Sequence, residues 1–236
     1  MNREETKQLF DEQASEYDQK WVNMAAINDG IYFFLPSIFA SLRPNARVLC
    51  VGAGTGKELL FLAKQFPSIH FSVVEPSGAM LEICRHRVER GGFTSRCTFH
   101  EGFLESFSDD NVHDAATCFL VSHFILDPIA RSELFRQIAC RMAPGGVLVS
   151  ADLASDMRSP ITDNLLRIWA TTMSDSEAGE AAVKKLKHAY SNDVAVLSPD
   201  SVISIITNGG FESVTQFYQA GVVHAFFATT PSIVSN

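Results

Sequence analysis

The chain has few of the features that mark secreted, membrane-spanning or metal-binding proteins. It has five cysteines, an odd number, and no Cys-x-x-Cys pair, so we expect neither a disulfide framework nor a zinc site. Its first residues, MNREETKQLFDEQ, are charged and contain no apolar signal segment. The longest apolar stretch, GIYFFLPSIFASL, is too short to span a bilayer. These absences predict a cytoplasmic protein without a membrane segment.

Basic charge and metal-ligand spacings are also scarce. The chain has 19 Lys and Arg against 27 Asp and Glu, a formal net charge of −8. Proteins that bind nucleic acid usually present a basic face, so this balance argues against nucleic acid as a partner. The seven histidines show no His-x-x-x-His or His-Glu-x-x-His spacing. We therefore predict no metal site.

What the chain does have is a regular alternation of short apolar runs and helical patterns. Strands are predicted at 47–51, 69–75, 96–102, 113–122 and 146–153, with helices at 57–66, 77–92 and 129–142 between them. This alternation predicts an α/β fold, a doubly wound and mostly parallel sheet covered on both faces. After a helix that begins at Ser198, two further runs, near 211–218 and 222–229, predict an antiparallel terminal hairpin and so a total of seven strands.

The remaining segments predict a helical lid within one domain that spans residues 1–236. Residues 1–40 are helical in pattern and precede the first strand, and residues 155–195 read as a helical insertion before the last helix. Both segments carry large aromatic residues, which would suit a closed pocket for a small or apolar molecule. These residues are Trp21, Tyr32, Phe33, Phe34, Trp169 and Tyr190. The basic run VKKLKH, residues 183–188, is typical of a solvated helix face.

The first strand runs into a glycine-rich turn, RVLCVGAGTGKELL, at residues 47–60. Bare backbone at a strand's carboxyl end lets a ligand approach closely, and the following helix offers free N–H groups. The pattern is neither a dinucleotide fingerprint, because Lys57 replaces its third glycine, nor a P-loop. Glu75 ends the next strand, where a carboxylate can accept hydrogen bonds from both hydroxyls of a ribose; it could also serve as an acid at the next helix N-terminus.

Three segments together resemble a known family. VLCVGAGTG, VVEPSGAML and APGGVLVSADL, with the terminal hairpin, are similar to the class I S-adenosylmethionine-dependent methyltransferases over about residues 10–230. The pattern FD…A..YD, here Phe10-Asp11, Ala14 and Tyr17-Asp18, is similar to the small-molecule methyltransferases of that superfamily. The resemblance implies a Rossmann-like sheet, S-adenosyl-L-methionine as cofactor and a small-molecule substrate; a homodimer stays open.

The resemblance also implies roles for individual residues. The cofactor would be contacted by Gly52, Ala53, Gly54, Gly56, Glu75, Pro76, Met80, Gly102, Phe103 and Leu120. Two departures stand out. Cys50 occupies the position of an acid that anchors the cofactor's ammonium group, and Phe103 that of an acid that contacts adenine. They imply weaker binding, another acid for the ammonium group, or a modified cofactor.

The catalytic residues are expected after the fourth strand, in FLVSHFILDP. Methyl transfer needs alignment of donor and acceptor and sometimes a base. His123 is the candidate base, since its reference pKa is near 6.5, and Asp127 would orient it or cap the next helix. Asp152 ends the fifth strand at the same edge and would face the site or cap a helix. Tyr17 would close over the methionine end of the cofactor.

The favoured hypothesis is an enzyme that transfers a methyl group from S-adenosylmethionine to a small molecule. One alternative is a synthase that modifies the cofactor, of the carboxy-S-adenosylmethionine type, which an inward-facing Arg158 or Arg167 would favour. Another is a cofactor-binding protein without catalysis, which Cys50 and Phe103 allow. An NAD-dependent dehydrogenase is disfavoured by Lys57 and the terminal hairpin.

Overall fold

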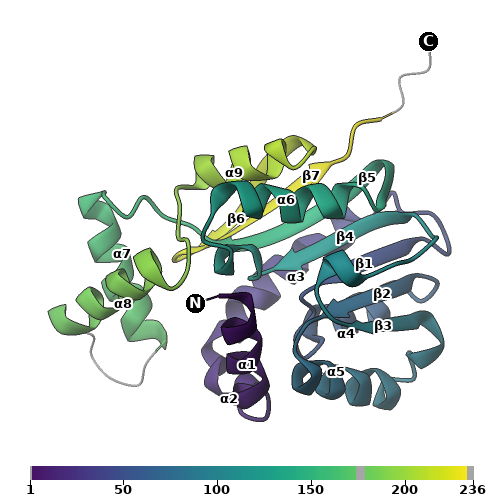
Figure 1. Ribbon diagram of the computed structural model, residues 1–236, viewed down its shortest axis with the longest axis horizontal. Helices are drawn as coiled ribbons and strands as arrows, with labels where there is room; N and C mark the ends of the chain where they lie inside the picture. The colour runs from purple at the N-terminus through teal and green to yellow at the C-terminus, as the bar shows by residue number, and fades with distance from the viewer. Residues whose placement is uncertain (1, 174–178, 233–236) are drawn as a thin grey trace.

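The computed structural model describes residues 2–173 and 179–232, and its centre is one sheet of seven strands in the order β3-β2-β1-β4-β5-β7-β6 (Figure 1). The strands are β1 (Arg47–Val51), β2 (His70–Glu75), β3 (Cys97–Glu101), β4 (His113–Phe119), β5 (Met142–Leu153), β6 (Glu212–Ala220) and β7 (Val223–Thr229). The first five are parallel, and β7 lies antiparallel between β5 and β6. This confirms the predicted mostly parallel sheet with an antiparallel terminal hairpin.

The strand order reverses direction between β1 and β4, because the chain winds outward to β3 and then returns to the other side of β1. In open α/β sheets, ligands bind in the crevice at the carboxyl ends of the strands at such a reversal. Pairing of Cys50 with Val73 on one side and Thr117 on the other aligns the three strand ends. The glycine turn after β1 therefore lies at the predicted binding edge.

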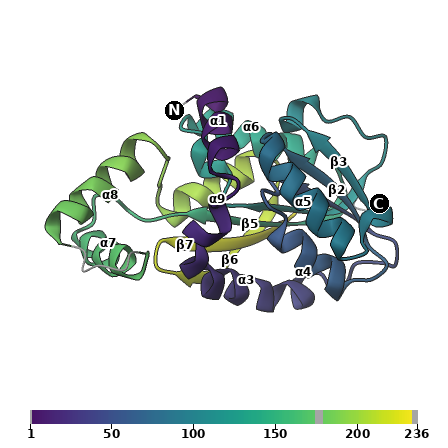
Figure 2. The same cartoon turned by 90° about the horizontal axis from the view of Figure 1, so that it is seen from below.

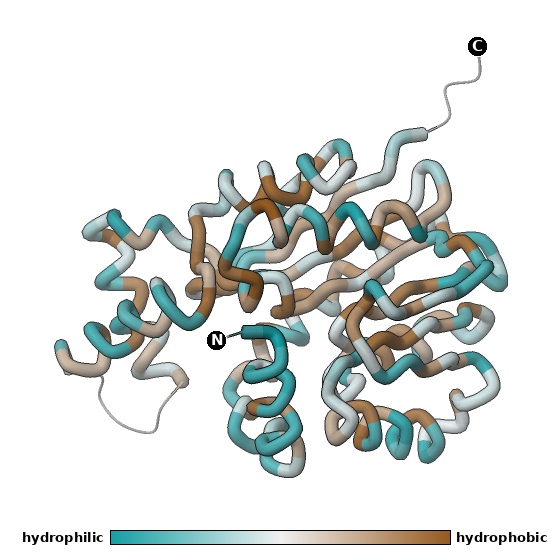
Figure 3. The backbone as a smooth tube through the Cα atoms, in the orientation of Figure 1, coloured by the Kyte–Doolittle hydropathy of each residue, from teal (hydrophilic) through white to brown (hydrophobic). Residues whose placement is uncertain are grey.

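Helices cover both faces of the sheet, as the two views at right angles show (Figures 1 and 2). On one face lie α3 (Ala25–Ile38), α4 (Lys57–Gln65) and α5 (Gly78–Arg90), and on the other α6 (Pro128–Ala139) and α9 (Pro199–Asn208). Successive side chains of a strand point to opposite faces, so β1 contributes Val48 and Cys50 to one apolar cluster and Leu49 to the other. The strands are accordingly among the most hydrophobic parts of the chain (Figure 3).

Five further helices lie beyond the carboxyl ends of the strands. They are α1 (Arg3–Gln13), α2 (Tyr17–Lys20), the short 3₁₀ helix η1 (Val22–Met24), α7 (Pro160–Met173) and α8 (Glu180–Asn192). A third apolar cluster, which includes Met24, Leu166 and Trp169, joins η1, α7 and α8 to β5 and β7. We call these five helices the cap. Residues 174–178 of the predicted insertion lie outside the described residues, and no described helix has the length and apolar character needed to cross a membrane.

Three predicted boundaries are wrong: the end of α6, the start of β5, which was predicted at 146, and the end of β4. The helix predicted to reach residue 142 ends at Ala139, and β5 begins at Met142, because the chain from Met142 onward pairs with β4 and the terminal segment. The Gly145 N–H, for example, donates to the Pro231 carbonyl at 3.3 Å. The strand predicted at 113–122 ends at Phe119, where Leu120 turns into the left-handed region with φ 57°. The segment Ser122–Phe124 then forms the 3₁₀ helix η4.

Candidate functional site

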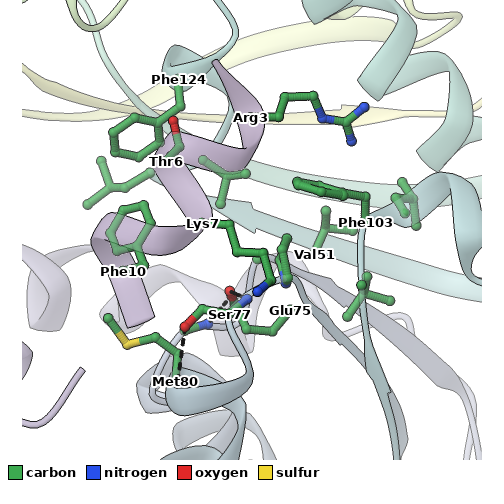
Figure 4. A pocket seen from close by; sticks show the side chains of 18 of the residues that line it. Arg3, Thr6, Lys7, Phe10, Val51, Glu75, Ser77, Met80, Phe103 and Phe124 are labelled. Atoms are coloured by element: carbon green, nitrogen blue, oxygen red, sulfur yellow. Dashed lines mark hydrogen bonds between the residues drawn. The ribbon is translucent and has the colours of Figure 1, made fainter. Parts of the chain in front are cut away.

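A cavity of about 170 Å³ lies over the carboxyl ends of β1 and β2 (Figure 4). We call it the first cavity. Residues of the turn and of the β2 end form its floor and wall, and Phe10 and Lys7 of α1 cover it. Of the predicted cofactor contacts, those that line it are Gly52, Gly54, Glu75, Pro76, Met80, Gly102, Phe103 and Leu120. The structure thus brings most of the predicted set to one place.

The three glycines of the turn have different physical roles. Gly54 has φ 54°, and a Cβ atom there would meet nothing within 4 Å, so this position faces open space inside the cavity. Gly56 has φ 81°, but a Cβ atom there would lie 2.5 Å from Cys84 Sγ. Gly56 is therefore bare for packing against α5, and neither it nor the buried Ala53 lines the cavity. The prediction that these two residues contact the cofactor is not supported.

Glu75 fixes the turn and still has capacity for a ligand. Its Oε2 accepts from the Gly54 N–H and its Oε1 from the Ser77 N–H, each at 2.8 Å. Burial raises the pKa of the Glu75 carboxyl, and these two N–H groups oppose that rise. A carboxylate offers about four lone-pair sites, so about two remain for the hydroxyls of a ribose. Both predicted roles, ribose acceptor and acid at the α5 N-terminus, fit this geometry.

The far end of the first cavity is an apolar slot with a cationic cover. Pro76, Met80, Phe103 and Leu104 line it. The Arg3 guanidinium lies 4.0 Å from the centre of the Phe103 ring and forms hydrogen bonds of 2.7 and 2.8 Å with Glu105 (Figure 4). Phe103 therefore supplies a flat apolar surface and holds α1 over the slot, where a planar base could stack.

Two aspartates attach the cap to the glycine turn and to α5. The Asp11 carboxylate accepts from Ser77 Oγ at 2.6 Å, from the Ala79 N–H at 3.2 Å and from Lys7 Nζ at 3.1 Å. The Asp18 carboxylate forms ion pairs with Arg87 and with Lys57, the latter at 3.1 Å. These are the aspartates of the FD…A..YD pattern. The pattern thus encodes the attachment of α1 and α2 over the turn.

A second cavity of about 310 Å³ adjoins the first beneath the cap. The two share four wall residues, Phe10, Tyr17, Leu120 and Phe124. Other walls of the second cavity come from Trp21, Trp169 and Tyr190, as predicted for the aromatic lid, while Phe33 is 76% exposed and takes no part. Two ligands could therefore meet at the shared wall.

His123 lies on the wall of the second cavity and is oriented by a buried carboxylate. Its Nδ1 lies 3.1 Å from Asp152 Oδ1. Asp152 also accepts from Ser122 Oγ at 2.8 Å and pairs with the fully buried Arg131 at 3.1 Å. Burial alone would raise the pKa of Asp152, but Arg131, His123 and Ser122 together hold it below its usual value. Because the ionised Asp152 carboxylate can only accept a hydrogen bond, His123 Nδ1 carries the hydrogen. Nε2 is then the unprotonated nitrogen of the ring, which can accept a proton or a hydrogen bond.

The orienting role predicted for Asp127 is corrected by this geometry. Asp127 is the N-cap of α6 and accepts from the Ile129 and Ala130 N–H groups at 2.7 and 2.9 Å. It lies on neither cavity wall. The alternative prediction for Asp127, a helix cap, is confirmed. For Asp152 the cap prediction is wrong, because it lies inside β5 and binds the His123 side chain.

Arg131 was not singled out from the sequence, although it lies on the buried face of α6. The apolar Ile129, near the start of the helix predicted at 129–142, is 82% exposed. The buried stripe is Arg131, Phe135 and Ile138, whose spacings of four and three residues match one helix face. A charged residue in phase with two buried apolar residues is the signal that could have revealed a buried ion pair.

Leu120 and Tyr17 stand where the two cavities meet. Leu120 has φ 57°, an uncommon conformation for a branched side chain, and its N–H donates to the Ala151 carbonyl at 2.7 Å. Such strain tends to occur at functional sites, where the surrounding structure enforces it. Burial raises the pKa of Tyr17 to about 12, so its phenol stays protonated and can only donate or accept a hydrogen bond.

Cys50, which stands where the family has an acid, and the nearby Glu58 are both buried behind the glycine turn. Cys50 is fully buried against α4, lines neither cavity, and has a pKa that burial raises well above its usual value. Glu58, two residues after the last glycine of the turn, is 7% exposed, and burial raises its pKa to about 8. Within the described residues, its carboxyl group has no ion-pair partner. The sequence pattern gave no sign of this buried acid.

Comparison with known families supports what this geometry indicates. Residues 48–146 match a family model described as a methyltransferase domain, a span that includes the glycine turn, Glu75 and His123. The same span contains Leu120 and Phe124, which line both cavities. Residues 48–146 therefore form a methyltransferase domain, and the chain has the fold of the class I S-adenosylmethionine-dependent methyltransferases.

The individual proteins to which this chain is similar are distant from it in sequence. A carboxy-S-adenosyl-L-methionine synthase from Desulfotalea psychrophila is 24% identical over 195 residues, which cover 80% of this chain and 78% of that protein. Among solved structures, a putative O-methyltransferase from Nostoc punctiforme superposes with a TM-score of 0.68 at 16% identity, covering 94% of this chain and 60% of that one. The N-methyltransferase NodS from Bradyrhizobium japonicum, solved with S-adenosyl-L-homocysteine, gives 0.58 at 15% identity over 86% and 87%. These structures share the fold.

Proposed function

We propose that the chain transfers a methyl group from S-adenosylmethionine to a hydroxyl group of a small molecule, with His123 as the general base. One observation carries the proposal. The cavity over the glycine turn and the cavity that contains His123 share a wall, so a donor in one would meet an acceptor in the other. The distant structural likeness to O-methyltransferases is consistent with it but carries no weight on the acceptor.

The residues present fit the cofactor. Gly54 leaves room for a ligand against the backbone, Glu75 keeps free lone pairs for a ribose, and Phe103 offers a flat apolar surface for adenine. When bound, S-adenosylmethionine supplies an activated methyl group, whose bond to sulfur breaks as the acceptor oxygen attacks, leaving S-adenosylhomocysteine. Cys50, being neutral and buried behind the turn, would not hold the ammonium group.

The chain's own task is to align the acceptor, exclude water and accept a proton. The cap lies over both cavities and restricts the access of water, and Asp11 and Asp18 hold α1 and α2 there. His123 Nε2 takes the hydroxyl proton as the acceptor oxygen forms its new bond to carbon. The positive charge that develops on the ring is stabilised by Asp152, which Arg131 keeps ionised.

The test is a methyl-transfer assay with His123→Gln beside wild type, using a panel of hydroxylated small molecules. We expect kcat to fall about 100-fold or more, while the affinity for S-adenosylhomocysteine stays unchanged. With acceptors whose hydroxyl is already ionised at the assay pH, kcat of His123→Gln should fall much less, because no base is needed to remove a proton. The matched control is His86→Gln, an exposed histidine on α5 paired only with glutamates. Full activity in His123→Gln, or cofactor binding without transfer to any acceptor, would overturn the proposal.

A second candidate function is a cofactor-modifying synthase, since a carboxy-S-adenosylmethionine synthase aligns with 80% of this chain. The arginines that the sequence offered for it do not support it. The Arg158 side chain is 95% exposed beside Asp156, and Arg167 forms a hydrogen bond with Asn164 on the surface of α7. Mass spectrometry of the cofactor product separates the two functions. A thioether product indicates methyl transfer, and a carboxymethyl sulfonium indicates the synthase.

A further inference from the structure

The second cavity combines aromatic walls with unpaired positive charge. Trp169 Nε1 donates to the Tyr190 hydroxyl at 2.8 Å, so the polar ends of these two rings satisfy each other. Trp169 is only 5% exposed and packs in the third apolar cluster, whereas Tyr190 is half-buried and keeps ring surface for a ligand. Phe124 and Trp21 add further ring surface to the walls. Flat aromatic walls of this kind favour a planar ligand.

Lys57 and Lys20 line the same cavity. Lys57 Nζ lies 3.1 Å from Asp18 Oδ1, but Asp18 also pairs with Arg87, so one carboxylate serves two cations. This group therefore keeps a net charge of about +1. Burial opposes the ionisation of Asp18, and Arg87 and Lys57 outweigh it, so the pKa of Asp18 is lowered and the carboxylate stays charged.

Lys20 has no acidic partner among the described residues. Its ammonium donates to the neutral Gln13 amide at 2.9 Å and lies 5.8 Å from the Trp21 ring centre. Asp193, the acid on the cavity wall, forms no ion pair with either lysine in the described part of the chain. In a protein of net charge −8, this cavity therefore presents an ammonium group that nothing neutralises.

We infer that the acceptor is a hydroxylated aromatic carboxylic acid, whose ring lies between the aromatic walls, whose carboxylate pairs with Lys20, and whose hydroxyl faces His123. Lys20, Lys57 and Arg87 against Asp18 and Asp193 leave a net charge of about +1 around this cavity, which matches a monoanion better than a phosphate. This inference rests on the proposed function for the role of His123, but the binding of the acid does not depend on catalysis. Lys20 is exposed, so its pairing with the acid should strengthen binding only about fivefold.

The test compares a panel of hydroxylated aromatic acids with their neutral amides, 4-hydroxybenzoate against 4-hydroxybenzamide for example. Binding is measured by calorimetry on protein loaded with S-adenosylhomocysteine. Wild type should bind its best acid about fivefold more tightly than the matching amide, and the difference should shrink as salt is raised. Lys20→Gln should abolish the difference while leaving amide binding unchanged. Lys64→Gln, an exposed lysine at the end of α4, should behave as wild type.

The outcomes separate this inference from the proposed function. If no acid binds better than its amide, or if Lys20→Gln weakens both equally, the inference is wrong. If amides are methylated as efficiently as acids, the proposed function stands and the inference falls. If the acid binds selectively through Lys20 but is never methylated, the inference stands and the proposed function falls.

Discussion

The two cavities share a wall but are built in different ways. The first is centred on backbone and short-range features, the turn after β1, Glu75 and the residues around Gly102, with apolar side chains from α1 and from residues 119–134 around them. The second is made of side chains from segments far apart in the sequence, between Leu9 and Val194. The backbone-built site follows from a spacing of glycines and an acid along two strands. The side-chain-built site follows from how the cap helices pack, which sets its specificity.

The same contrast is seen in two of the buried carboxyl groups. Asp152, beside the second cavity, has Arg131, His123 and Ser122 as partners, and its pKa is lowered. Glu58, behind the glycine turn, has no ion-pair partner among the described residues, and burial raises its pKa to about 8. One buried carboxyl is therefore held charged, and the other is held neutral at moderate pH.

The largest effect is expected from Asp152→Asn. Asparagine preserves the size of the side chain but leaves the fully buried Arg131 without its counter-charge, which should cost about 3–5 kcal/mol of unfolding free energy. Urea denaturation at pH 7 measures this loss. Asp127→Asn is the control, because asparagine caps a helix as well as aspartate does and the site is exposed. Equal stabilities of the two variants would mean that Arg131 does not depend on Asp152.

The next effect is a pH dependence that comes from Glu58. Burial raises its folded-state pKa from the ordinary value of 4.5 to about 8, so folding favours the protonated form. Its contribution to stability is therefore complete below about pH 4.5 and is lost as the pH rises through 8. Between pH 5 and 8 the wild type should lose about 3 kcal/mol relative to Glu58→Gln, as urea unfolding at several pH values would measure. A constant difference between the two proteins would show that Glu58 is ionised in the fold.

Most of the sheet and the first cavity could be predicted from the sequence, because local patterns encode them. Strand and helix periods gave the layers, and the glycine spacing with Glu75 gave the binding edge. The second cavity could be predicted only as an aromatic inventory, because Trp21 and Trp169 come together through tertiary packing. Arg131 was missed because only the folded helix shows that Arg131, and not the apolar Ile129, lies on the buried face of α6. Asp127 was misjudged as a partner of His123 because closeness in sequence does not decide which carboxylate a folded histidine meets.

The backbone character of the first cavity is tested by Gly54→Val. The added side chain would occupy the open space over the turn and should weaken S-adenosylhomocysteine binding about 100-fold, since overpacking a fitted site costs about 1–3 kcal/mol. Gly92→Val is a closely matched control. Gly92 also has a positive φ, 74°, and open space around its Cβ position, but it lies after α5 and away from both cavities. Both variants should be destabilised similarly, and calorimetry should find that only Gly54→Val loses binding.

The smallest effect is expected where the cap joins the backbone-built site. Asp11→Asn removes the charge that pairs with Lys7 and weakens the hydrogen bonds to Ser77 and Ala79 that hold α1 over the first cavity. Because Asp11 is half-exposed, global stability should change by less than about 1 kcal/mol. The cap should open more often, and S-adenosylhomocysteine should dissociate about threefold to fivefold faster in stopped-flow measurements. Glu12→Gln, at an exposed neighbour whose carboxylate accepts a hydrogen bond from Gln8 on the same helix, should leave the rate unchanged. If Asp11→Asn also leaves it unchanged, α1 does not control release, and the first cavity is closed by its backbone walls alone.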